Sequence, residues 1–351
     1  MAVRMHRRGG IGRLVAALVA GVAFAGPALA DGQVNVYSYR QPALIKPMLD
    51  AFTAETGIKT NVVFAQAGLE ERIATEGTNS PADVLLSVDV GRLDAAAKAG
   101  ITQPIVSEVV VADIPAQYRD PDGNWVGLTQ RGRVVYASKD RVKDTEITYE
   151  DLADPKWKGK ICTRSGQHVY NIGLFASLVA HHGVDKATQI IEGIKNNLAM
   201  KPTGGDREQA KAIAAGQCDI ALGNTYYVGL METNEKDPEQ KKWAEAIRII
   251  FPNANDRGTS VNISGVVLAK NAPNKADAIK LIEFLTTDKA QELYATANFE
   301  YPVKPGVPIS PIVAAWGPLK ADPLPLAELA ADRKQASEIV DKVDFDAGPS
   351  N

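Results

Sequence analysis

The sequence contains few of the residues that build most metal and redox sites. Only two cysteines, Cys162 and Cys218, and four histidines occur among its 351 residues. Two lone cysteines without Cys-x-x-Cys spacing make a poor metal site, and two are too few for a fold held together by disulfides. A thiolate metal centre is therefore not expected.

The motifs of several common enzyme classes are absent as well. The chain has no G-x-S-x-G, no H-E-x-x-H, no phosphate-binding P-loop and no dinucleotide-binding glycine pattern. Four histidines leave little general-base capacity, although carboxylates can also serve. An exported enzyme is the alternative, but the sequence predicts that this protein is not an enzyme.

The long hydrophobic run of this sequence lies at its N-terminus. Four arginines precede an apolar stretch at Leu14–Ala25, and Ala28-Leu29-Ala30 stands just before Asp31. A basic start, an apolar middle and a small-residue end are the parts of a secretory signal peptide. The run is shorter than the roughly 20 residues that a bilayer crossing needs, which disfavours the alternative of a membrane anchor. We expect residues 1–30 to be a signal peptide, cleaved after about Ala30.

Removal of the signal peptide leaves an acidic chain. The mature sequence has 35 basic against 42 acidic side chains, a net charge of −7. Such a surface does not suit nucleic acid or anionic membranes. At typical domain size, about 320 residues predict two domains. Export favours a disulfide between Cys162 and Cys218 over two free thiols.

Short hydrophobic strands alternate with amphipathic helices at the start of the mature chain. We expect strands at 34–38, 60–64 and 83–87, and helices at 44–56, 68–77 and 91–99. This alternation predicts a parallel sheet with helices on both faces.

A second α/β unit follows, and the chain then returns to the first. We expect strands at 133–138, 160–164, 218–222 and 262–270, and helices at 172–182, 187–196 and 274–285. Asn274 is expected to cap the last of these helices. The pattern predicts a two-lobed α/β protein in which the chain crosses between lobes near 132–133 and again near 257–261. A ligand then binds in the cleft between the lobes.

Six short segments, spread over the mature chain, carry a family resemblance. They are Val36–Pro42 (VYSYRQP), Ser80–Leu86 (SPADVLL), Asp154–Lys160 (DPKWKGK), Gly223–Tyr227 (GNTYY), Asn262–Val266 (NISGV) and Glu300–Val303 (EYPV). In sequence and in order these segments resemble the periplasmic ferric-ion-binding proteins of bacterial ABC importers.

The resemblance implies a fold, a cargo and a partner. The implied fold is a type II-like periplasmic binding protein, with two doubly covered sheets joined by two hinge crossings. Residues 31–132 and 258–305 would form the N-lobe, and residues 133–257 and 306–351 the C-lobe. The implied protein is a soluble periplasmic monomer that binds Fe³⁺, delivers it to an inner-membrane ABC permease and has no nucleic-acid partner.

In that family tyrosine side chains hold the metal, and three positions match here: Tyr170, Tyr226 and Tyr227. Small, hard Fe³⁺ prefers anionic oxygen donors such as phenolate, and three phenolates balance its charge. Neighbours on a regular strand face opposite sides. Tyr226 and Tyr227 are therefore expected to converge at a turn leading into a helix, for which Gly223-Asn224-Thr225 is suited. The alternative is a packed aromatic pair.

Two further metal ligands of some relatives are missing. Those relatives have Arg-His-Tyr after the first strand, where this chain has Arg40-Gln41-Pro42. In this respect the chain is similar to the subgroup that uses a carbonate-like synergistic anion, and the positions matching the anion contacts are Arg40, Gln41 and Arg131. Arginine and glutamine donate hydrogen bonds to such an oxyanion. A salt bridge is the alternative role for Arg131. Packing is the expected role of Tyr39, and a place on the floor of the cleft is the alternative.

Other ligands are compatible with the same fold. Binding proteins of this architecture also carry thiamine, polyamines, sulfate or phosphonates, so a small organic or oxyanion ligand is the alternative cargo. Those ligands do not need a Tyr-Tyr dipeptide plus a third tyrosine. Colour separates the two hypotheses, because iron–phenolate complexes absorb visible light.

Overall fold

The computed structural model describes residues 32–349. The expected signal peptide, residues 1–30, lies outside this range. No helix within residues 32–349 combines the length and the hydrophobicity that a membrane crossing requires.

Strands and helices alternate along the chain in a mixed α/β order. The strands are β1 (Gln33–Ser38), β2 (Lys59–Phe64), β3 (Val84–Ser87), β4 (Thr102–Gln103), β5 (Val126–Ser138), β6 (Ile161–Cys162), β7 (Ile220–Asn224), β8 (Ile247–Ile250), β9 (Val261–Ala269) and β10 (Tyr301–Pro302). The helices are α1 (Pro42–Thr56), α2 (Leu69–Glu76), α3 (Val90–Lys98), α4 (Glu108–Asp113), α5 (Val169–Asn196), α6 (Asp206–Ala214), α7 (Tyr226–Glu232), α8 (Glu239–Glu245), α9 (Lys275–Thr286), α10 (Asp288–Ala297), α11 (Pro311–Ala315), α12 (Leu326–Ala331) and α13 (Arg333–Lys342).

The structure corrects several expected boundaries. The helices expected at 172–182 and 187–196 share the label α5 but are separated, as expected, by a kink at Gly183, whose backbone is non-helical with φ of 72° and ψ of 166°. β7 begins at Ile220 rather than at 218, and the backbone N–H groups of Asp219 and Ile220 both donate to the carbonyl of Lys160. Asn274 does not cap α9 through its side chain. That side chain instead donates to the buried carboxylate of Asp83, at 3.0 Å.

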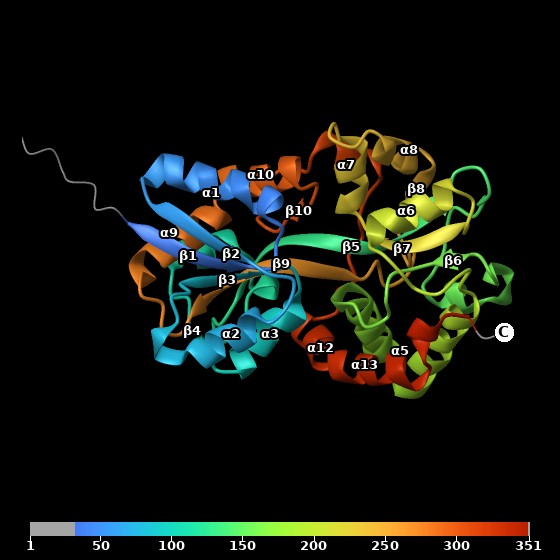
Figure 1. The fold of residues 1–351 in the computed structure, drawn as a ribbon, viewed down its shortest axis with the longest axis horizontal. Helices are drawn as coiled ribbons and strands as arrows, with labels where there is room; N and C mark the ends of the chain where they lie inside the picture. Colours follow the sequence, from blue (N-terminus) through green and yellow to red (C-terminus); the bar gives the residue numbers. More distant parts are fainter. Residues whose placement is uncertain (1–31, 350–351) are drawn as a thin grey trace, which may run out of the picture. The chain divides into compact units, whose positions relative to one another are not determined.

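The sheet is mixed rather than parallel throughout. β1 pairs in parallel with β2 and β3, and β6 pairs in parallel with β7. Between these groups, β9 and β5 are antiparallel to each other and to their outer neighbours, β3 and β7. The hydrogen-bonded order is β2-β1-β3-β9-β5-β7-β6. The two expected sheets are thus joined through β5, which, together with β9, runs between the two groups of elements in Figure 1.

β5 changes its main pairing partner in the middle of the strand. Gly132 is opposite Val261 of β9, whereas the next residue, Arg133, is opposite Asn224 of β7. Successive side chains on a strand alternate between its faces, so Arg131 and Arg133 share one face at this switch. Both are buried. The change of partner therefore brings two cationic side chains to the junction of the two sheets.

Helices cover both faces of the N-terminal sheet. Val34 and Val36 of β1 belong to an apolar core that includes Phe52 of α1 and Leu281 of α9. Tyr37, which points to the other face, belongs to a second core with residues of α2 and α3. In Figure 1, α1 and α9 lie on one side of these strands and α2 and α3 on the other. Burial of a side chain such as Phe52 stabilises the fold by about 1.5–3 kcal/mol.

The predicted disulfide is confirmed. Cys162 at the end of β6 is bonded to Cys218, which lies just before β7, and their Cα atoms are 5.9 Å apart. The bond fastens the start of β7 to its parallel neighbour, in the part of the sheet that ends at the Tyr-Tyr pair.

Candidate metal and anion site

Tyr226 and Tyr227 stand where a strand turns into a helix. β7 ends at Asn224, Thr225 is the N-cap residue, and α7 begins with the two tyrosines. Their ring centroids are 4.3 Å apart. The predicted turn into a helix is thus observed, and it keeps two adjacent side chains close together.

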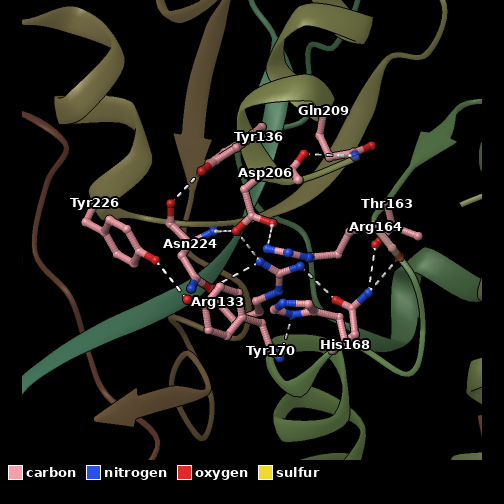
Figure 2. Close-up of polar contacts among 12 residues, drawn as sticks. Arg133, Tyr136, Thr163, Arg164, His168, Tyr170, Asp206, Gln209, Asn224 and Tyr226 are labelled. Carbon is pink, nitrogen blue, oxygen red and sulfur yellow. Dashed lines mark hydrogen bonds and ion pairs between the residues drawn. The ribbon is translucent and has the colours of Figure 1, made fainter. Parts of the chain in front are cut away.

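Tyr170 approaches this pair from the first turn of another helix. His168 is the N-cap of α5, and its imidazole accepts the backbone N–H of Tyr170. Burial, followed by the nearby Arg164, lowers the pKa of His168 to about 3, so the imidazole is a neutral acceptor at any physiological pH. The hydroxyls of Tyr170 and Tyr226 are 3.1 Å apart and point toward each other in Figure 2.

Arginine side chains surround the tyrosine rings. The guanidinium carbon of Arg164 lies 5.0 Å from the ring centroid of Tyr170, and those of Arg131 and Arg133 lie 5.9 and 6.0 Å from it. Another guanidinium, that of Arg207, lies 5.2 Å from the ring of Tyr227. This positive surrounding favours the anionic form of a phenol.

Burial opposes that ionisation. It raises the pKa of Tyr226 well above 10, with Tyr170 and Tyr227 adding to the rise and Arg131 counteracting it. The pKa of Tyr227 is also raised, first by burial and then by Tyr170 and Asp206. Both hydroxyls are therefore protonated at neutral pH until a cation replaces the proton.

The described residues offer few other metal ligands. Within residues 32–349, no group of three or more His, Cys, Asp and Glu side chains is placed to hold a metal ion. The three tyrosines are a donor set of hard oxygens, and in the ionised form they carry three negative charges. Such a set fits a small trivalent cation.

Arg131 carries a buried charge beside these tyrosines. Its side chain is 1% exposed, and it donates to two neutral oxygens, Ser264 Oγ at 3.2 Å and the carbonyl of Val88. Arg131 lines one pocket together with Arg133, Tyr170 and Asn224. Within the described part of the chain, Nε of both arginines and Nδ2 of Asn224 are buried without a hydrogen-bond acceptor. The residues that line the pocket therefore carry unpaired donors, which suit an anion.

The other two expected anion contacts differ from Arg131. Arg40 is buried and forms an ion pair with Glu300 at 2.9 Å, and it also donates to Ser264 Oγ. Ser264 thus connects Arg40 and Arg131. Gln41 is exposed and is the N-cap residue of α1, without a side-chain capping bond.

Tyr39 is packed away from the tyrosine cluster. Its hydroxyl donates to Glu70 and accepts the backbone N–H of Leu69 at 2.7 Å, which holds it against α2. The guanidinium of Arg92 covers its ring, 3.9 Å from the centroid. The expectation that Tyr39 is a packing residue agrees with these contacts.

Sequence reasoning missed several polar residues that support the site. Asn171, Asp206 and Asn224 are all buried and make hydrogen bonds to Arg133. The spacing of Arg131 and Arg133 on a strand was a usable signal, because it places two charges on one face. No local pattern pointed to the other three.

The chain is similar to known proteins over most of its length. Residues 37–292 match the family model of bacterial extracellular solute-binding proteins. Iron uptake protein A1 of Synechocystis sp. is 45% identical over 312 residues, which cover 88% of this chain and 86% of that protein. The structure of apo ferric ion-binding protein A from Pasteurella haemolytica has a TM-score of 0.86 and 52% identity, covering 90% of this chain and 98% of the other. A Trichodesmium protein in complex with iron and citrate ligands has a TM-score of 0.84 and 42% identity, covering 90% and 100%.

Proposed function

Because the chain belongs to the family of bacterial extracellular solute-binding proteins, we propose that it is the periplasmic component of an ABC importer whose cargo is ferric iron. Its fold is the two-lobed α/β fold of its solved relatives. The observation that carries the proposal is the pair of hydroxyls of Tyr170 and Tyr226, 3.1 Å apart, with Tyr227 beside them. Relatives named for iron uptake and ferric-ion binding support the same cargo.

The proposed metal ligands are Tyr170, Tyr226 and Tyr227. Three phenolates would neutralise Fe³⁺, which avoids the large cost of a buried unbalanced charge. Because burial raises the pKa of Tyr226 and Tyr227, iron must displace their protons on binding. Loading should therefore release protons, and acid should favour release of the iron.

A carbonate-like synergistic anion is proposed to complete the coordination, held by Arg131 together with Arg40 and Gln41. The buried Arg131, whose acceptors within residues 32–349 are two neutral oxygens, supports this assignment. Gln41 stands at the positive N-terminal end of α1, where an anion is also stabilised. A relative solved with both iron and citrate gives further support for an anion beside the metal.

We assign residues 31–132 and 258–305 to the N-lobe and residues 133–257 and 306–351 to the C-lobe. The change of partner along β5 between Gly132 and Arg133 supports this boundary. Iron would then be delivered to an inner-membrane permease without chemical transformation, so no enzymatic role is proposed.

Replacement of Tyr226 or Tyr227 by phenylalanine tests the proposal, because it removes only the ligand oxygen. Mutation of a residue that only hydrogen-bonds to a metal ligand typically lowers metal affinity about 10- to 100-fold. Each of these variants loses a ligand oxygen and should therefore lose more iron affinity than that. The visible iron–phenolate absorption should weaken in parallel. Both quantities can be measured in iron-loaded protein titrated with a competing chelator.

Tyr37→Phe is the matched control. Tyr37 is also a buried tyrosine, but its hydroxyl bonds to Glu76 at 3.0 Å in another part of the fold. This variant should bind iron as the wild type does. Normal iron affinity in both the Tyr226 and the Tyr227 variants would show that the ligand assignment is wrong.

A further inference from the structure

A buried guanidinium connects the two chain segments that carry the tyrosines. Nη2 of Arg133 donates to Oδ1 of Asn171 at 2.7 Å, and Nη1 donates to Oδ1 of Asn224 at 3.1 Å. Asn171 directly follows Tyr170 in α5, and Asn224 ends the strand that leads to Tyr226. Figure 2 shows Arg133 between these segments.

A carboxylate fixes the same guanidinium from a third segment. Asp206 at the start of α6 accepts from Nη1 of Arg133 at 2.7 Å and from Arg164 at 3.2 Å. It also accepts the backbone N–H of Asn224 at 2.8 Å. Asp206 therefore offsets the buried charge of Arg133 and fixes the end of β7 at the same time.

Asn171 is itself anchored firmly. Its Nδ2 donates to Oγ1 of Thr163 at 3.0 Å and to the carbonyls of Arg164 and Ser165, at 3.0 and 3.1 Å. The first turn of α5 is thus tied to the segment that follows β6. A shift of Arg133 would be transmitted to a rigid element rather than absorbed by a loose side chain.

The four side chains of this network are all buried, with exposures of 4% or less. Hydrogen bonds to charged groups are stronger in such surroundings than in water. Arginine presents several donors in one rigid plane, whereas lysine is a point charge on a flexible stem. Lysine could replace the charge of Arg133 but not its simultaneous bonds to three partners.

We propose that Arg133 is a positioning residue that holds Tyr170 and Tyr226 at the separation needed to bind one metal ion. The inference rests on the proposed function, in which these tyrosines are iron ligands. Arg133 does not touch the metal; it acts through Asn171 and Asn224. The tyrosines would then be arranged before iron arrives, which reduces the cost of ordering them on binding.

The test is Arg133→Lys, measured as apparent Fe³⁺ affinity, visible spectrum and thermal unfolding of the iron-free protein. The affinity for Fe³⁺ should fall by about 10- to 100-fold, which is the usual loss when a residue that supports a metal ligand is mutated. The iron–phenolate band should shift or weaken, which a merely structural role would not cause. Arg141→Lys is the matched control, because Arg141 also bonds to an aspartate, Asp219, and to two carbonyls, but away from the tyrosines. It should behave as the wild type.

Asn224→Ala is a second variant, which removes the bond of Arg133 to the Tyr226 segment together with the unpaired Nδ2 of Asn224. It should lose affinity in the same direction but less than Arg133→Lys. Wild-type affinity together with an unchanged iron–phenolate band in Arg133→Lys would overturn the proposal. If Arg133→Lys does not fold, the same result in Asn224→Ala would overturn it.

A crystal structure of iron-free Arg133→Lys separates this inference from the proposed function. The hydroxyls of Tyr170 and Tyr226 should be farther apart than the 3.1 Å of the wild-type chain. An unchanged separation would overturn the positioning role even if iron binds as proposed. Absence of an iron–phenolate band in the wild type would instead contradict the proposed function, whatever the separation of the two hydroxyls.

Discussion

At the scale of single residues, Arg131 and Arg133 show how neighbouring charges can have different roles. They are two positions apart on β5, and both are buried. Arg133 is paired with the carboxylate of Asp206, whereas Arg131 donates to Ser264 and Val88. A buried cation without a counter-charge is costly. A bound anion beside Arg131 would remove that cost, which is why we expect the anion there.

Added bicarbonate should therefore strengthen iron binding by the wild-type protein. Arg131→Gln should abolish most of that dependence, lower the affinity by about tenfold or more and shift the iron–phenolate absorption. The measurement is chelator competition in buffers with and without bicarbonate, the latter under argon, with Arg141→Gln as the control. Full wild-type affinity without any added anion would mean that a protein side chain completes the coordination.

At the scale of elements, Glu150 ties together segments that are far apart in the sequence. It lies in a short 3-10 helix at Glu150–Ala153, and its carboxylate bonds to His182 of α5 at 2.6 Å. It also accepts from Asn253 at 3.0 Å and from Arg257, both in the chain between β8 and β9. Burial alone would raise the pKa of Glu150, but the hydrogen bonds from these three partners lower it to about 2.

Glu150→Gln should be less stable than the wild type by about 1–3 kcal/mol at pH 7. A carboxylate whose pKa is lowered on folding contributes stability that is present above its unfolded pKa, near 4.5, and is lost as the pH falls toward 2. The wild type should therefore lose more unfolding free energy than Glu150→Gln between pH 7 and pH 3, as measured by urea unfolding.

The control for this experiment is Glu239→Gln on α8. Glu239 is exposed and pairs with Lys242 at 2.6 Å. Its loss should change the stability by less than about 0.5 kcal/mol at either pH. An identical pH dependence in Glu150→Gln and in the wild type would contradict the role of the carboxylate.

At the scale of the whole molecule, one continuous set of hydrogen-bonded strands includes both groups of elements. β5 pairs with β9 and β10 in its first part and with β7 and β8 in its second. The disulfide between Cys162 and Cys218 lies in the part of the sheet that contains β6 and β7, and it joins residues separated by 56 positions in the sequence. Closing a loop of that length restricts the unfolded chain considerably.

Removal of this disulfide, by reduction or by replacing both cysteines with alanine, should lower the free energy of unfolding by roughly 4 kcal/mol. Thermal unfolding with and without reductant measures the effect. Thiol titration of the denatured, unreduced protein should detect no free thiol. Two titratable thiols, or an unfolding temperature that does not respond to reductant, would contradict the prediction.

The sequence by itself determined the features that depend on local patterns. Apolar periodicity gave β1, α1 and β2 to within a few residues, because the side-chain spacing of strands and helices is fixed by their geometry. The Tyr226-Tyr227 turn followed from the residues just before it. With only two cysteines in an exported chain, the disulfide pairing had a single intramolecular solution.

Only the tertiary structure decided which residues, distant in the sequence, pair with each buried charge. Arg133 meets Asp206, 73 positions away, and Arg40 meets Glu300, 260 positions away. The bond from Asn274 to Asp83, in place of a helix cap, has the same origin. Periodicity reports which face of an element is buried but not which element covers it. The partner of a buried polar group depends on strand order and on the pairing switch within β5, and these are properties of the folded chain as a whole.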